Sequence, residues 1–146
     1  MTGFVLDCSI AASWCFEDEA APETDLLLQR IRDEGAVVPS LWRLEIGNVL
    51  LQAERRGRVR AVDVGMRIAL LGALPIVTDE ETSPRALREI FTLARAESLT
   101  TYDAAYLELA MRRGLPLATK DRALHAAASR VGITAIPMAA ASPTFC

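Results

Sequence analysis

Short apolar runs of strand length alternate with helical patterns along the chain, and this alternation limits the possible folds more than any other feature. The predicted strands cover residues 3–7, 36–38, 74–78, 115–119 and 134–136. The predicted helices cover residues 9–16, 23–34, 41–56, 61–72, 83–97, 101–113 and 121–131. This pattern indicates an α/β fold in three layers, a mainly parallel sheet flanked by helices on both faces.

Local signals refine this picture. Ser40 is expected to cap helix 41–56, and Pro84 to occupy the first position of helix 83–97. Pro75 cannot donate a backbone hydrogen bond, which favours an edge position or a strand start for its strand.

The chain has no internal repeat, linker or break in composition, so residues 1–146 are expected to form one domain, with the tail 138–146 unassigned. Apolar residues make up 51% and the net charge is −3, which is typical of a globular protein and not of one that coats nucleic acid non-specifically. No apolar run is long enough to span a membrane, and the N-terminus lacks a basic leader. We therefore expect a cytoplasmic protein without membrane contact.

Three cysteines and one histidine argue against several classes of site. The cysteines are too sparse for a disulfide framework, and Cys8 and Cys15 have no companion Cys or His at ligand spacing, so buried thiols are expected. His125 lies among alanines, where a packing or surface role is expected. A zinc site or a histidine-based catalytic triad is therefore not predicted.

Two acids directly follow predicted strands. Asp7 comes after residues 4–6, and Asp121 comes just after residues 117–119. The carboxyl ends of parallel strands meet at one edge of a sheet, where α/β folds bind their ligands, so both acids are expected at that edge. Each acid also precedes a predicted helix and could instead be its N-cap.

Two further acids lie on helix faces where a charge is costly. Glu45 belongs to helix 41–56, which is apolar nearly all round and expected to be buried, with Asn48 one turn away and able to orient it. Asp103 projects from the apolar stripe of its helix. As alternatives, Glu45 could pair with an arginine of another helix, and Asp103 could form a capping box with Thr100. Four separate coincidences would be needed, however, to place all four acids in this way.

Clustered carboxylates repel one another and raise each other's pKa unless a cation lies among them. Oxygen ligands without Cys or His suit Mg²⁺ or Mn²⁺, and one or two such ions can activate a water against a phosphodiester. Ser9 and Thr119 are small hydroxyl residues near Asp7 and Asp121. They are suited to support the acids or to contact phosphate, with helix capping as the alternative.

A basic cluster follows helix 41–56, and its members are Arg55, Arg56, Arg58 and Arg60. Arginine suits phosphate well, although a run of charges is also typical of a solvated helix end. Lys120 is either solvated or a further phosphate contact.

Four segments resemble, in order and spacing, the acidic motifs of the PIN-domain nucleases: VLDCS (5–9), PSLWRLEIGN (39–48), LTTYDAAY (99–106) and LPLATKD (115–121). The resemblance spans nearly the whole chain and is greatest to the VapC toxins of bacterial toxin–antitoxin pairs. It implies a PIN fold and a Mg²⁺- or Mn²⁺-dependent endoribonuclease that hydrolyses RNA phosphodiesters with a metal-activated water. It also implies a homodimer inhibited by a cognate small antitoxin.

The resemblance and the positions beside the acids together assign roles. The expected catalytic and metal-binding residues are Asp7, Glu45, Asp103 and Asp121, the last binding directly or through water. The expected supporting residues are Ser9, Asn48, Thr100 and Thr119. The candidates for holding the RNA backbone are Arg55, Arg56, Arg58 and Arg60. Cys8 departs from the small residue common at its position, and a thiol there could admit softer or oxidising ions.

Other functions stay open at this point. A phosphoaspartate phosphatase would have a second Asp two residues after the first, where this chain has Ser9. A phospho-receiver, or another Mg²⁺-binding signalling module without nuclease activity, would need an acidic pair where Asp7 stands alone. It would also need a phosphorylatable Asp after a central strand, whereas Asp79 and Glu80 follow an expected edge strand. A binding module that has lost catalysis is disfavoured because all four acids are present.

Overall fold

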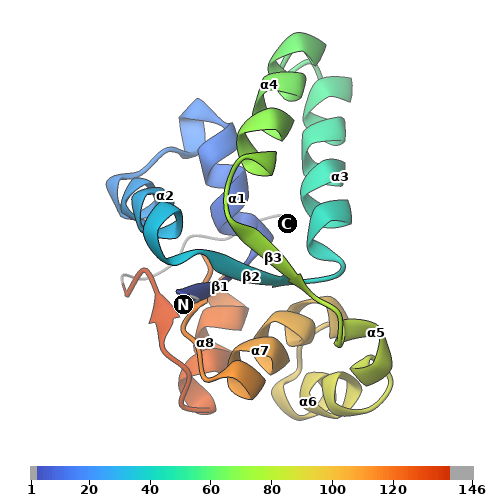
Figure 1. The fold of residues 1–146 in the computed structure, drawn as a ribbon. Coiled ribbons are helices and arrows are strands. Elements are labelled where there is room, and N and C mark those ends of the chain that lie inside the picture. The colour runs from blue at the N-terminus through green and yellow to red at the C-terminus, as the bar shows by residue number, and fades with distance from the viewer. Residues whose placement is uncertain (1–2, 139–146) are drawn as a thin grey trace.

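The structure is a computed structural model that describes residues 3–138, so nearly all of the tail 138–146 lies outside the described residues. Its strands form one parallel sheet in the order β3-β2-β1-β4-β5 (Figure 1). The strands are β1 (Phe4–Leu6), β2 (Ala36–Pro39), β3 (Ile76–Asp79), β4 (Leu117–Ala118) and β5 (Ala135–Ile136). The predicted parallel α/β sheet is confirmed, and β3 is an edge strand as Pro75 indicated.

Helices cover both faces of the sheet, with α1 to α4 on one side and α5 to α8 on the other (Figure 1). They are α1 (Cys8–Cys15), the short 3-10 helix η1 (Glu17–Glu19), α2 (Pro22–Glu34), α3 (Trp42–Arg55), α4 (Ala61–Gly72), α5 (Thr82–Arg85), α6 (Glu89–Glu97), α7 (Thr101–Arg113) and α8 (Arg122–Arg130). Two predicted helices, 61–72 and 101–113, have the observed bounds. Within residues 3–138, no helix combines the length and apolarity that a membrane span requires.

Strand β1 lies at the centre of the sheet, and all three of its residues are fully buried. It pairs with β2 on one side and with β4 on the other, where Leu6 is aligned with Ala118. Asp7 and Thr119 are the next residues of these two neighbouring strands. Parallel pairing therefore brings together, at the carboxyl edge, two residues that are 112 positions apart in the chain.

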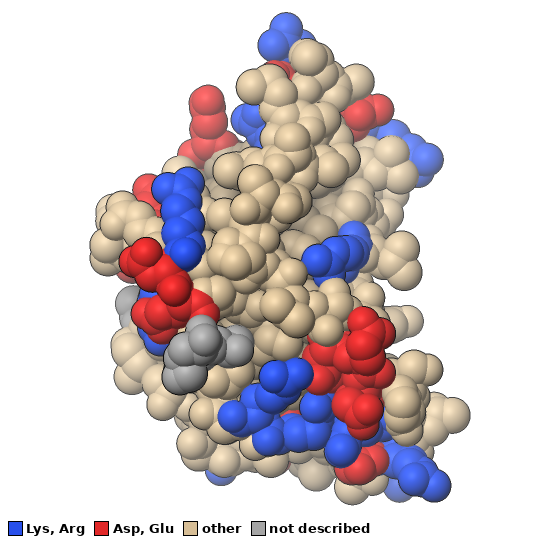
Figure 2. Space-filling model, viewed as in Figure 1, with Lys and Arg blue, Asp and Glu red and all other residues tan. Residues whose placement is uncertain are grey.

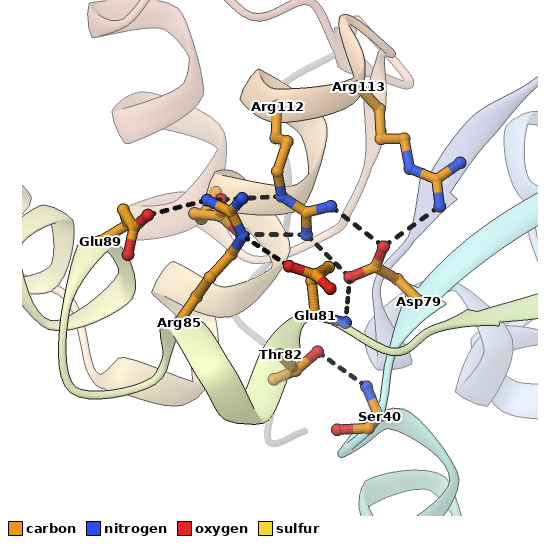
Figure 3. A network of polar contacts seen from close by, with 9 residues as sticks. Ser40, Asp79, Glu81, Thr82, Arg85, Glu89, Arg112 and Arg113 are labelled. Atoms are coloured by element: carbon orange, nitrogen blue, oxygen red, sulfur yellow. Dashed lines mark hydrogen bonds and ion pairs between the residues drawn. The ribbon is translucent and has the colours of Figure 1, made fainter.

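Two predictions about the helices are wrong. The single helix 83–97 is broken into α5 and α6, and Arg88 between them has the non-helical angles φ −124° and ψ −105°. Leu87 in this break is 85% exposed, so no burial of an apolar face favours a continuous helix there. Ser40 does not cap α3; its backbone N–H instead donates to the hydroxyl of Thr82 over 3.1 Å (Figure 3).

A network of ion pairs fixes the edge strand β3 to the end of α7 (Figure 3). Asp79, only 3% exposed, accepts hydrogen bonds from Arg112 at 2.7 and 3.0 Å and from Arg113 at 3.1 Å. Arg112 also pairs with Glu108 one turn earlier, at 3.0 Å. The two guanidinium groups lower the pKa of Asp79 to about 2, with the hydrogen bond from Arg112 as the largest cause. This buried acid is fully compensated by positive charge.

Replacing Asp79 with Asn should lower the free energy of unfolding by about 2 kcal/mol at pH 7, because a pKa lowered from 3.8 to about 2 reports stabilisation of the ionised form in the fold. This stabilisation is present above pH 4 and is lost as the pH falls towards 2. Urea unfolding at pH 7 and pH 3 should therefore give a smaller difference between the two proteins at pH 3. Asp63→Asn, which removes an exposed pair with Arg60, is the control and should cost less.

Candidate functional site

Asp7 is a buried carboxylate at the carboxyl end of β1, with a side chain that is only 4% exposed. It occupies the N-cap position of α1 but makes no side-chain capping bond, so the capping alternative does not describe it. Its Oδ2 accepts hydrogen bonds from Ser9 Oγ and from Thr119 Oγ1, both at 2.7 Å. Burial raises the pKa of Asp7, and these two hydroxyls oppose that rise. Ser9 and Thr119 thus lie where support for the acid was predicted.

Both hydroxyls are themselves held by backbone groups at the start of the segment that leads into α8. Ser9 Oγ accepts from the N–H of Lys120 at 2.8 Å, and Thr119 Oγ1 accepts from the N–H of Asp121 at 3.0 Å. Each hydroxyl therefore donates its single proton to Asp7 and accepts a backbone N–H with one of its lone pairs. This arrangement fixes the direction of the hydrogen bonds and the position of the carboxylate.

Glu45 lies in the first turn of α3 and is half-buried. Its Oε1 accepts a hydrogen bond from the hydroxyl of Tyr106 on α7. Burial raises the pKa of Glu45, the bond from Tyr106 opposes the rise, and the charge of Asp7 adds to it. The expected all-round burial of α3 is wrong: its buried residues form one stripe, and Leu44 is 80% exposed. The stripe faces α1 and the core, so the apolar composition of α3 overstated its burial.

Asp103 lies in the first turn of α7, where its backbone N–H donates to Thr100 Oγ1 at 3.1 Å. Thr100 is thus the N-cap of α7. The Asp103 side chain returns no capping bond among the described residues. Its pKa is raised to about 7, first by burial and then by the charges of Asp7, Asp121 and Glu45.

Asp121 is the N-cap of α8 and accepts from the N–H of Leu124 at 3.0 Å through Oδ1. The capping alternative is therefore correct for this acid. Its charge still raises the pKa of Asp7 and of Asp103, which places it beside them. Asp121 is consequently the acid whose position is most fully explained by the fold alone.

The four predicted acids thus act on one another electrostatically at the carboxyl edge of the sheet. Within the described part of the chain, no lysine or arginine forms an ion pair with them, in contrast to Asp79. Nor are any three His, Cys, Asp or Glu side chains of residues 3–138 gathered closely enough to form a finished metal cluster. The four acids are mutually repelling carboxylates at one edge of the sheet, and oxygen donors of this kind fit a hard divalent cation.

Other predicted site residues are placed less favourably. Asn48 is exposed, and no hydrogen bond joins it to Glu45 among residues 3–138, where the bond from Tyr106 takes that role. Arg58 lies over the ring of Phe16 at 3.9 Å and pairs with Asp18 at 2.6 Å and Glu19 at 2.9 Å.

The remaining basic residues differ in how they are held. Arg60 pairs with Asp63 at 3.0 Å. Arg55 and Arg56 are exposed and form no ion pair within the described residues, and they lie about 15 Å from Glu45 along α3 at 1.5 Å per residue.

His125, Cys8 and Cys15 take the structural roles expected of them. A ring nitrogen of His125 lies 3.1 Å from the carbonyl oxygen of Pro137, and Cys8 and Cys15 are buried. Tyr106 was not singled out from the sequence. Its signal is present, because it follows Asp103 by three residues and so shares a face of α7 with it.

The parallel α/β fold and the four acids at the carboxyl edge of its sheet agree with the family comparison. Residues 4–130 match the PIN domain, and the chain belongs to this family. Among curated proteins, the chain is similar to Ribonuclease VapC3 of Pyrobaculum aerophilum, with 27% identity over 120 residues that cover 82% of this chain and 90% of the relative. Among solved structures, it is similar to the crystal structure of PAE2754 from the same organism. That match has a TM-score of 0.69 and 25% identity, and it covers 92% of this chain and 84% of the other.

Asp103→Asn should increase the free energy of unfolding by about 1–3 kcal/mol at pH 8 in EDTA, because a pKa raised to about 7 means that the ionised carboxylate destabilises the fold. This pH dependence is opposite to that of an acid such as Asp79, whose pKa is lowered in the fold. The destabilisation is absent below pH 4, grows as the pH rises, and is complete above pH 7, so the two proteins should converge near pH 4. Denaturant unfolding at both pH values measures this. Exposed Asp33→Asn is the control, and equal gains in the two variants would contradict the interpretation.

Proposed function

We propose that this chain is a Mg²⁺- or Mn²⁺-dependent endoribonuclease that acts as the toxin of a VapBC-type toxin–antitoxin pair. The observation that carries the proposal is the group of Asp7, Glu45, Asp103 and Asp121, which is buried or half-buried at the carboxyl edge without a basic partner in the described chain. Membership of the PIN family and the similarity to a named ribonuclease support the same activity.

The residues present fit a divalent cation. Asp7, Glu45 and Asp103 would hold it, and Asp121, which already caps α8, would bind directly or through water. When bound, such a cation activates a water and neutralises charge on the phosphodiester under attack. Ser9 and Thr119 hold Asp7 in place, and Tyr106 holds Glu45, so two of the acids are oriented before substrate arrives.

The substrate is proposed to be RNA, held through its phosphates. Exposed Arg55 and Arg56 are available for such contacts, whereas Arg58 and Arg60 are engaged in ion pairs with acids of this chain. With a net charge of −3, affinity should depend on local arginines and on the cation rather than on the overall charge. Binding should therefore weaken as salt is raised.

The phospho-receiver alternative receives no support. The acid at the end of β3 that could have been its phosphorylation site, Asp79, is 3% exposed and bound by Arg112 and Arg113. It also lies on an edge strand, away from the central β1. Labelling with acetyl phosphate tests this alternative directly and should give no incorporation.

Asp7→Asn and Asp103→Asn should each abolish Mn²⁺-dependent cleavage of labelled single-stranded RNA, lowering the rate by about two orders of magnitude or more. Both changes remove a charge while keeping the side-chain shape, so circular dichroism should show an intact fold. Asp33→Asn makes the same change on α2, three residues before the amino end of β2, and should retain full activity. Full activity in either active-site variant would overturn the proposed function.

The proposal includes two protein partners, a second copy of the chain and a cognate small antitoxin. An exposed apolar stripe on α4 supports a protein contact, because monomeric proteins rarely expose contiguous apolar patches. Val62 and Met66 of this stripe are each 62% exposed, one turn apart, and Ala69 and Ala73 continue it. Figure 2 shows the surface over α4 as nearly free of charged side chains, whereas charges of both signs gather near β3 and α5.

We assign this stripe to the homodimer. In light scattering after size exclusion, the chain should have twice its single-chain mass of 15.9 kDa, and Met66→Glu should reduce it to the single-chain mass. Leu87→Glu places the same charge at an exposed apolar residue outside α4 and should leave the dimer intact. A single-chain mass for the unaltered protein would contradict the homodimer. The antitoxin is tested separately, by co-expressing the small protein encoded by the neighbouring reading frame and measuring RNA cleavage.

A further inference from the structure

Tyr106 places a polar hydroxyl inside the buried central part of α7. Its side chain is 0% exposed, within a run of α7 in which residues 104–110 are all buried. A buried tyrosine hydroxyl needs a hydrogen-bond partner, whereas phenylalanine would fill the same space without one. The partner here is Glu45 Oε1, on a helix that lies on the opposite side of the sheet.

The hydrogen bond between Tyr106 and Glu45 connects the helices that carry two of the proposed metal-binding acids, Glu45 and Asp103. Tyr106 follows Asp103 by three residues on α7, so the two side chains share a face of that helix. Glu45 belongs to α3, and within residues 3–138 no other hydrogen bond or ion pair holds its carboxylate. This contact therefore connects the carboxylate of Glu45 on α3 to the helix that carries Asp103.

Glu45 needs such a contact more than Asp7 or Asp121 does. Asp7 is held by Ser9 and Thr119, and Asp121 is held by the N–H of Leu124. A glutamate side chain has more rotatable bonds than an aspartate and loses more conformational freedom when it is fixed. Without the hydroxyl, a half-buried carboxylate would also lose its hydrogen-bond partner.

We propose that Tyr106 is a positioning residue for the cation site: its hydroxyl occupies Oε1 of Glu45 and so leaves Oε2 as the oxygen available to the metal. Tyr106 contacts neither metal nor substrate in this scheme and acts entirely through Glu45. The inference rests on the proposed function, in that it takes Glu45 to be a metal ligand.

The test compares two identical substitutions on one helix. Tyr106→Phe removes the hydroxyl that binds Glu45, and Tyr102→Phe removes a hydroxyl from a side chain that is 65% exposed and makes no hydrogen bond within the described residues. Mn²⁺ affinity is measured by isothermal titration calorimetry without RNA, and kcat and KM for labelled RNA are measured over a range of Mn²⁺ concentrations.

Tyr106→Phe should weaken Mn²⁺ binding by about 10-fold or more, which is the usual effect of removing a group that orients a metal ligand. The lost activity should return as Mn²⁺ is raised, with KM for RNA unchanged at saturating Mn²⁺. Tyr102→Phe should match the unaltered protein in all three quantities. An unchanged Mn²⁺ affinity in Tyr106→Phe would overturn the inference, even if its melting temperature fell.

A second pair of variants separates positioning from a general effect on folding. If Tyr106 acts through Glu45, adding Tyr106→Phe to Glu45→Gln should weaken Mn²⁺ binding no further. Additive losses would contradict the inference. Absence of Mn²⁺-dependent cleavage by the unaltered protein would instead refute the proposed function, whereas normal cleavage with equal Mn²⁺ affinity in the Tyr106 variant would refute this inference alone.

Discussion

Burial of Asp7 at the end of the central strand is the constraint on which the rest of the site depends. A carboxylate that is only 4% exposed loses most of its hydration, which raises its pKa and disfavours the ionised form. Two hydroxyls, those of Ser9 and Thr119, donate hydrogen bonds to the carboxylate and oppose this rise. Each hydroxyl in turn accepts a hydrogen bond from a backbone N–H, that of residue 120 or 121. The pairing of β1 with β4 is what brings the hydroxyl of Thr119 within reach.

Asp79 and Asp103 have opposite electrostatic surroundings. Asp79 is surrounded by the guanidinium groups of Arg112 and Arg113, and its pKa falls to about 2 (Figure 3). Asp103 is half-buried and pairs with no arginine of residues 3–138, and its pKa rises to about 7, first through burial and then through the charges of other carboxylates. The first arrangement stabilises the fold by itself, while the second is unfavourable until positive charge is added from outside. This difference distinguishes an acid that is compensated within the fold from one that is proposed to bind a cation more clearly than burial does.

Charge repulsion at the edge cluster must be offset by the rest of the structure. Helix α7 provides much of this offset, because it is buried over residues 104–110 and packs against β1 and β2. The same helix carries Asp103 at its first turn and the Asp79 network at its last. A single well-packed element therefore positions an acid of the site and anchors the edge of the sheet, which couples the rigidity of the site to the stability of the core.

The amino-acid sequence by itself determined the order of strands and helices, the parallel sheet, and the position of Asp7 and Asp121 after strands at one edge. These follow from local patterns: apolar runs of strand length, helical periodicity and the residues that begin and end helices. The acid motifs were also readable in order and spacing, because each lies within a few residues of an element boundary. Where no local pattern decided, as for the break at Arg88 or the exposure of Leu44, the predictions failed.

Only the tertiary structure decided which partner each acid has. Thr119 bonds Asp7 although the two are 112 residues apart in the chain, and Tyr106 bonds Glu45 although they are 61 residues apart. No local periodicity in the sequence predicts contacts at such separations. The pairing of Asp79 with arginines likewise depends on how α7 packs on the sheet, whereas the capping role of Asp121 is local and was among the alternatives that the sequence offered. The physical reason is that burial and hydrogen bonding of a carboxylate are set by everything that surrounds it in space, whereas a sequence pattern reports only its neighbours along the chain.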